Sequence, residues 1–307
     1  MLKVLAILEV ASAHFLEPRF PIVWAPTAVS LLIFAYGSAY FTYRAYGVGF
    51  DRKAYWLRKA QRLGVRLLAV DAVLLGLFLM QGREGIWSWE SLVCAVGLQG
   101  WLSWLYLPNP SPFGRGMWFL TLLLVFYTVY PWLARVLSTD RRRATWVTVG
   151  WCATAWALEW LFPYGHALWL TTCGFVVGTY AGQWGMPIGR RGGIGFLVLA
   201  GAAAVLNGTG VKVLNFPLLL GIFLVAVAWW HGFHAPRWVQ NTTLPFAGCL
   251  LEIYLLHMYL FVHPTGSLGV DLLLSLALVL AVAKFLDGFV IYAAHLLNPK
   301  PEPLRTS

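Results

Sequence analysis

The chain has 307 residues, of which 60% are hydrophobic and only 11% are charged, and its formal net charge is +10. Soluble domains carry about 25% charged residues, so this composition excludes an ordinary water-soluble globule. It predicts a protein that uses lipid as part of its solvent. In such a protein the positive charge serves mainly to orient membrane helices, so we expect no nucleic-acid partner.

Apolar segments follow one another along nearly the whole chain, without a long polar stretch between them. We therefore predict one membrane-embedded domain, residues 1–297, followed by a short cytoplasmic tail, residues 298–307. The four cysteines lie in apolar segments without C-x-x-C spacing, so we expect buried thiols and no metal. The eleven apolar segments lie near residues 2–17, 22–43, 63–81, 90–107, 117–136, 145–162, 166–183, 194–207, 216–231, 243–263 and 270–296.

Two strongly basic loops decide which segments cross the membrane. One lies at 44–66 and the other at 135–143, and the positive-inside rule puts both in the cytoplasm. An even number of crossings must then lie between them, yet three candidate segments do. The segment 90–107 is rich in Trp and Gly and ends in Pro108-Asn109-Pro110, so we predict that it is re-entrant or interfacial.

The predicted fold is therefore an all-α membrane protein with about ten transmembrane helices and both termini inside. In this topology 17 of the 22 Lys and Arg residues lie on the inner side and 4 on the outer side, with Lys284 inside a helix. The bias agrees with the positive-inside rule.

The N-terminus also imitates a secretory signal peptide. Lys3 precedes a short apolar run, and Ala11-Ser12-Ala13 resembles an A-x-A cleavage site. Glu9 interrupts that run, so we expect the segment to remain as the first helix. Cleavage after Ala13 is the alternative.

Lys3 and His14 form the most informative pair of polar residues in the first apolar segment. Eleven residues at about 100° each come within about 20° of three full turns, so both side chains lie on one helical face, about 16 Å apart. A neutral imidazole inside the membrane could act as a general base. A histidine that only packs against a neighbouring helix, with Lys3 as an orienting charge, explains the pair equally well.

Other polar residues in apolar segments have simpler explanations. Lys284 and Asp287 are three residues apart, which predicts an ion pair on one face of the last helix. Tyr254 and His257 either line a site or form hydrogen bonds between helices.

The basic loop at 44–66 also allows two interpretations. Its cations could orient the chain and contact anionic lipids. Alternatively, four of them could bind phosphate, because arginine suits bidentate phosphate contacts. These four recur at helical spacing and are Arg58, Lys59, Arg62 and Arg66.

Taken together, these features resemble the acyltransferase-3 family of membrane O-acyltransferases, which has ten transmembrane helices. Members show Arg or Lys, ten residues and then His on helix 1, and an Arg-x-x-Arg element after helix 2. A Trp-Phe/Tyr-Leu element with downstream Tyr and Pro and a late Tyr-Leu-x-His segment follow. The matching residues here are Lys3 and His14, then Lys59-Ala60-Gln61-Arg62, then Trp118-Phe119-Leu120 with Tyr127 and Pro131, and then Tyr254-Leu255-Leu256-His257.

This chain also departs from the family pattern. Lys59 stands in place of the first Arg, and the Ser-Gly pair often found in helix 2 is reversed to Gly37-Ser38. Thr121 and its neighbours replace a Glu that often follows the Trp element. These differences concern the subfamily, and hence the acceptor, rather than His14.

The resemblance implies transfer of an acyl group, commonly acetyl from acetyl-CoA, to a hydroxyl of a sugar, cell-envelope glycan or glycosylated product. It implies a multi-pass protein of a bacterial plasma membrane, in contact with lipids, with no metal. His14 would be the catalytic base, or would carry the acyl group, and Lys3 would help to position the donor. The basic residues Arg58, Lys59, Arg62 and Arg66 would bind CoA, and the acceptor side would contain Trp118, Tyr127, Tyr254 and His257.

Two other functions remain open. Trp230-His231-Gly232 resembles an element of the membrane-bound O-acyltransferase (MBOAT) class, in which His231 would replace His14 as the reactive group. A transporter or exporter of a lipid-linked glycan is the non-enzymatic alternative. Proton coupling would then use the intramembrane carboxylates of Glu9, Asp71, Glu159 and Asp287.

Overall fold

The structure is a computed structural model of the whole chain. It describes residues 1–20, 24–162, 168–186, 215–232 and 235–297, together with isolated positions between 192 and 205. The segment 194–207 lies largely outside the described residues, and the expected tail, 298–307, lies wholly outside them.

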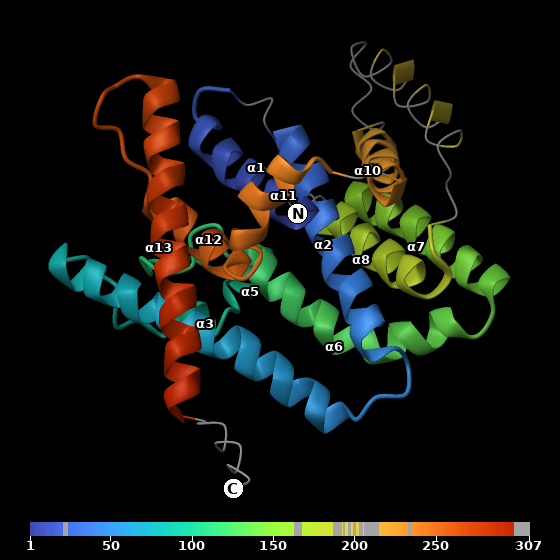
Figure 1. The fold of residues 1–307 in the computed structure, drawn as a ribbon, viewed down its shortest axis with the longest axis horizontal. Coiled ribbons are helices and arrows are strands. Elements are labelled where there is room, and N and C mark those ends of the chain that lie inside the picture. The colour runs from blue at the N-terminus through green and yellow to red at the C-terminus, as the bar shows by residue number, and fades with distance from the viewer. Residues whose placement is uncertain are drawn as a thin grey trace, which may run out of the picture. The chain divides into compact units, whose positions relative to one another are not determined.

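The described residues contain twelve α-helices and two short 3-10 helices, and no strand. The chain divides into two compact units, each built from two stretches of sequence. Figure 1 shows the helices coloured by their order along the chain. Unit 1 comprises Met1–Tyr55 and Phe119–Ala247, and unit 2 comprises Trp56–Trp118 and Gly248–Ser307. The all-α class is confirmed, and whether the chain forms a single domain stays a prediction.

Unit 1 contains the helices from the beginning and the middle of the chain. They are α1 (Leu2–Leu16), α2 (Trp24–Tyr46), α6 (Trp118–Ser138, from Phe119 onward), α7 (Arg141–Leu161), α8 (Leu168–Trp184), α10 (Asn215–Gly232) and α11 (Arg237–Thr243), followed by the 3-10 turn η3 (Leu244–Phe246).

Three glycines on α8 bring this helix against α2. Gly174, Gly178 and Gly182 recur every four residues, so they line one face of α8. A Cβ atom at position 178 would lie 2.9 Å from the Cβ of Ala39 and would collide with the carbonyl of Tyr36. Cβ atoms at 174 and 182 would collide with α2 in the same way. This small-x-x-x-small pattern is typical of helices that pack closely in membranes.

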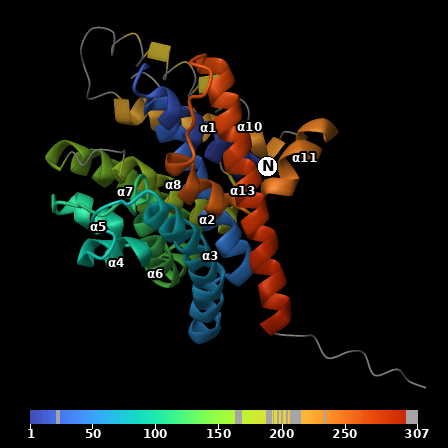
Figure 2. The ribbon, with the colours of Figure 1, turned by 90° about the vertical axis from the view of Figure 1, so that its left-hand side faces the viewer.

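Unit 2 contains α3 (Arg52–Met80, from Trp56 onward), α4 (Trp89–Ala95), α5 (Gln99–Trp104), α12 (Leu250–Leu256), η4 (His257–Tyr259) and α13 (Leu268–Leu297). Figure 2 shows α13 as one long uninterrupted helix and α4 and α5 as two short ones. The segment 90–107, predicted to be re-entrant or interfacial, forms these two helices of 7 and 6 residues. Both are much shorter than the roughly 20 residues that a span needs.

Within the described part of the chain, three helices are long and apolar enough to cross a membrane, which indicates a membrane protein. They are α3, α6 and residues Leu268–Ala293 of α13. The expected number of ten spans is therefore wrong for this part of the chain.

The other expected spans are too short or not apolar enough to cross a membrane. The helices α1 and α8 have 15 and 17 residues. The expected span 243–263 is interrupted around Pro245 and Gly248, so that η3, α12 and η4 form in its place. The longer helices α2 and α7 are rich in Tyr, Trp and Thr, which lower their hydropathy.

The glycine contact predicts a site-specific sensitivity to side-chain size. Replacing Gly178 by Leu forces a side chain into the backbone of α2. This should lower the free energy of unfolding by about 1–3 kcal/mol or more. Gly150, on α7, is the matched control, because a Cβ atom there meets nothing within 4 Å. Unfolding in mixed micelles measures both variants. Equal stability of Gly178→Leu and Gly150→Leu would contradict the close packing of α2 and α8.

Candidate functional site

Helix α1 carries both residues of the predicted catalytic pair. It runs without interruption from Leu2 to Leu16, with Lys3 in its first turn and His14 in its last. Both side chains are half-buried. An unbroken α-helix keeps the same-face relation that the spacing of eleven residues predicts.

The neighbouring helix α2 fixes the course of the Lys3 side chain. A Cβ atom at Gly37 would lie 2.8 Å from Lys3 Cδ, so the lysine stem lies directly on the glycine. The Lys3 ammonium lies 4.8 Å from the centroid of the Phe34 ring, within the range of a cation–π contact. Thus Gly37, from the reversed Gly-Ser pair, contributes directly to the placement of Lys3.

His231, the histidine of the MBOAT-like alternative, also lies in unit 1, in the last turn of α10. Its Nε2 atom lies 2.6 Å from the hydroxyl of Tyr36 on α2, and its ring packs against Tyr40. This hydrogen bond joins α10 to α2 and gives His231 a structural explanation.

In unit 2, the Tyr-Leu-x-His segment contacts the loop that precedes Trp118. The Tyr254 hydroxyl donates a hydrogen bond to the carbonyl of Gly116, 138 residues away in sequence. A Cβ atom at Gly116 would lie 3.1 Å from Met258 Cγ and 3.9 Å from His257 Nε2. The Tyr-Leu-x-His segment therefore contacts a glycine that lies two residues before Trp118 and whose φ of +70° few other residues adopt.

The hydrogen bonding of His257 determines which of its nitrogens carries the proton. Its Nδ1 atom lies 2.6 Å from the carbonyl oxygen of Tyr254. A carbonyl oxygen can only accept, so Nδ1 is the donor, and in the neutral ring the lone pair is on Nε2. The His257 side chain is completely buried, with its Nε2 on the side of Gly116.

The cations predicted to bind phosphate separate into two groups. Arg58 and Arg62 are exposed on the first half of α3, and Lys59 between them is buried. The basic stretch is thus helical from Arg52 onward rather than a loop.

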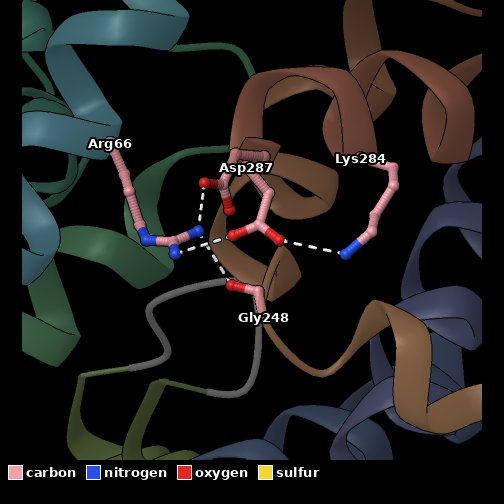
Figure 3. A network of polar contacts seen from close by, with 5 residues as sticks. Arg66, Gly248, Lys284 and Asp287 are labelled. Carbon is pink, nitrogen blue, oxygen red and sulfur yellow. Dashed lines mark hydrogen bonds and ion pairs between the residues drawn. The ribbon is translucent and has the colours of Figure 1, made fainter. Parts of the chain in front are cut away.

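Arg66 instead forms ion pairs within unit 2 (Figure 3). Its Nη2 donates to Asp287 Oδ1 at 2.8 Å, and its Nη1 donates both to the Gly248 carbonyl at 2.8 Å and to Glu252. On the other side of Asp287, Lys284 donates to Oδ2 at 3.2 Å, which confirms the predicted ion pair. Glu252 is fully buried and Asp287 nearly so.

The predicted site residues are divided between the two units. Unit 1 contains Lys3, His14 and Tyr127, and the other predicted residues belong to unit 2. Trp118 and Tyr127 are buried on α6. Their role at an acceptor stays a prediction.

Sequence reasoning did not find the partners of Arg66 or the role of Gly116. Glu252 and Asp287 were visible as charges in apolar segments, but the sequence gives no spacing that links either to α3. Gly116 was visible only as one glycine of Gly114-Arg115-Gly116.

Comparisons of the chain with models of protein families, with curated proteins and with solved structures found no match. The chemistry of the residues themselves and the motif resemblance described above support the function proposed below.

The Arg66 network predicts a large difference between two arginines of the same helix. Replacing Arg66 by Leu leaves fully buried Glu252 without a cation and Asp287 with Lys284 alone, which should lower the free energy of unfolding by about 3–5 kcal/mol. Replacing exposed Arg62 by Leu should change it by less than about 0.5 kcal/mol. Thermal unfolding of both variants in the same detergent measures the difference. Similar values for the two would show that the network does not stabilise unit 2.

Proposed function

We propose that this protein is a membrane-embedded O-acyltransferase. It transfers an acyl group, which we expect to be acetyl, from acyl-CoA to a hydroxyl of a sugar, cell-envelope glycan or glycosylated product. Its place is the plasma membrane of a bacterium, with the basic half of α3 on the cytoplasmic side.

The observation that carries the proposal is the arrangement of Lys3 and His14 on α1. One uninterrupted helix holds both residues, and Gly37 and Phe34 hold the lysine stem and ammonium in place. The Lys3 cation lies near one end of the helix, and the His14 imidazole lies about three turns away. This separation suits an extended donor molecule that reaches into the membrane.

In the proposed reaction His14 acts as the general base. It takes the proton of the acceptor hydroxyl while the oxygen attacks the thioester carbonyl, so that a C–O bond forms and the C–S bond breaks. The CoA thiolate leaves and takes up the proton from the imidazolium. Formation of an acyl-histidine before transfer to the acceptor is the alternative order.

The donor phosphates are assigned to Arg58 and Arg62, whereas a phosphate contact of Lys59, which is buried between them, stays a prediction. Arg58 and Arg62 are exposed on consecutive turns of α3, as binding of a polyphosphate requires. Arg66 is left out, because its guanidinium already binds two carboxylates and a carbonyl. Arg66 therefore holds α3 against other segments of unit 2 and does not bind CoA.

The acceptor is assigned to the turn that carries Tyr254 and His257. Their contact with Gly116 supports this assignment, because it joins the Tyr-Leu-x-His segment to the residues just before Trp118.

Histidine variants test the proposed reaction. Reconstituted protein is given labelled acetyl-CoA and methyl β-D-glucopyranoside as a model acceptor, and the labelled acetyl ester is counted. Replacing His14 by Ala should lower kcat at least about 100-fold, because it removes the general base. Replacing His231 by Ala should leave most of the activity.

The opposite result, with activity lost only in the His231 variant, would favour an MBOAT-like mechanism. Normal transfer by the His14→Ala variant would refute the assignment of the base. Movement of a lipid-linked glycan across the vesicle membrane without any acetyl transfer would replace the enzyme by a transporter.

A further inference from the structure

Helix α4 in unit 2 has the reverse of the polarity that a helix at the surface of a water-soluble protein shows. Its polar residues Glu90 and Ser91 are buried, and only 8% of the glutamate surface is exposed. Its apolar residues Trp89 and Leu92 are exposed, the leucine to 71%. In water this arrangement is unfavourable, because apolar groups are normally buried and charged groups exposed.

The exposed apolar residues of α4 lie on one side of the helix. Leu92 and Val96 follow Trp89 by three and seven residues, a spacing that brings side chains to one helical face. We call these three residues the α4 face. Glu90 is the only charged residue of the sequence between positions 85 and 107. Since Glu90 is buried, no charge interrupts the α4 face.

Hydrogen bonds hold the polar side of α4 against the protein. The Ser91 hydroxyl donates to the Gly85 carbonyl at 2.8 Å and lies 2.7 Å from the Ser111 hydroxyl. The Asn109 amide donates to Cys94 Sγ at 3.6 Å. Both Ser111 and Asn109 belong to the loop that follows α5. These contacts fix which side of α4 faces inward, so they also hold the α4 face outward.

The same loop places α4 at one end of a helix that can cross a membrane. The ring of Phe113 lies 4.9 Å from the ring of Phe78, which is in the last turn of α3. Helix α3 is one of the three described helices that are long and apolar enough to span a bilayer. Its exposed cations, Arg58 and Arg62, lie in its first half, away from this end. The end of α3 marks a membrane surface, so α4 lies at the level of that surface.

Lipid fits the α4 face better than a protein partner does. Tryptophan is enriched where acyl chains meet head groups, because its ring is apolar and its indole N–H can donate a hydrogen bond. A protein interface normally adds a polar rim, whereas the large exposed residues next to the face along the chain, Trp87, Trp101 and Leu105, are again apolar. The continuity with α3 also favours lipid, because the bilayer already surrounds that helix.

We infer that α4 docks on the surface of the lipid bilayer, with Trp89, Leu92 and Val96 inserted at the boundary between head groups and acyl chains. The sequence leaves open whether this segment is interfacial or re-entrant, and a re-entrant segment would extend toward the middle of the bilayer instead. In the orientation of the proposed function the docking surface is the outer one. The lipid contact itself does not depend on that function.

Spin-label accessibility measures the surroundings of the α4 face directly. A nitroxide is attached to Leu92→Cys in liposomes of phosphatidylcholine and phosphatidylglycerol, and its collisions with oxygen and with a water-soluble nickel chelate are compared. Replacing Cys152 by Ala removes the partly exposed native thiol, and the other three cysteines are buried. Oxygen concentrates in lipid and the chelate stays in water. The label should therefore collide mainly with oxygen, at a depth of about 5–10 Å into the boundary.

Two other exposed positions of unit 2 calibrate the measurement. Glu84→Cys, in the turn before α4, should report water. Leu278→Cys, near the middle of the candidate span Leu268–Ala293, should report the interior of the bilayer. Val96→Cys repeats the measurement on the α4 face and carries the test if the Leu92 variant does not fold. The melting temperature of each labelled variant shows whether it is folded.

Three results would overturn the inference. A label at Leu92 with the water accessibility of Glu84 would show that the face is not in lipid, and a depth equal to that of Leu278 would show a re-entrant segment. Few collisions with either reagent would show that protein covers the face. None of these results depends on acetyl transfer, so the histidine variants test the proposed function separately.

Discussion

The Arg66 guanidinium is the interaction on which the described arrangement of unit 2 depends. It joins α3 to the turn before α12, to Glu252 on α12 and to Asp287 on α13. These segments are far apart in sequence, and a membrane offers no water to replace a lost partner. The pairing keeps α12 beside α3 and so also positions the following turn, η4, which carries His257 and Tyr259. An arginine that the sequence predicts to bind CoA is thus part of the support of the candidate acceptor site.

Unit 1 is held together by shape rather than by charge. Lipid tails are as apolar as leucine, so helices in a membrane gain little from burying apolar side chains and associate through close packing. Gly174, Gly178 and Gly182 allow that packing between α8 and α2. Within the same stretch of α2, Gly37 accommodates the stem of Lys3 from α1 in the same way. Glycine therefore serves both the architecture of this unit and the placement of a proposed catalytic side chain.

Local relations could be predicted from the sequence, whereas relations between distant segments could not. The Lys284–Asp287 pair and the single helix carrying Lys3 and His14 follow from helical spacing alone. The partners of Arg66 come from segments about 180 to 220 residues away, and spacing on α3 cannot reveal them. The length of the apolar segments also overestimated the number of membrane spans, because Pro245 and Gly248 break one of these segments into short helices. The glycine repeat of α8 was readable in the sequence, since membrane helices use this pattern.

The central claim is that the chain uses an acyl-CoA donor whose phosphates bind the basic half of α3. Equilibrium binding of acetyl-CoA to the purified protein in nanodiscs tests it most directly, with CoA and acetyl-pantetheine as competitors. We expect saturable binding that CoA displaces and that acetyl-pantetheine displaces only weakly. Binding should weaken as the salt concentration rises, because the phosphates supply the charge. Absence of saturable binding, or equal displacement by both competitors, would contradict it.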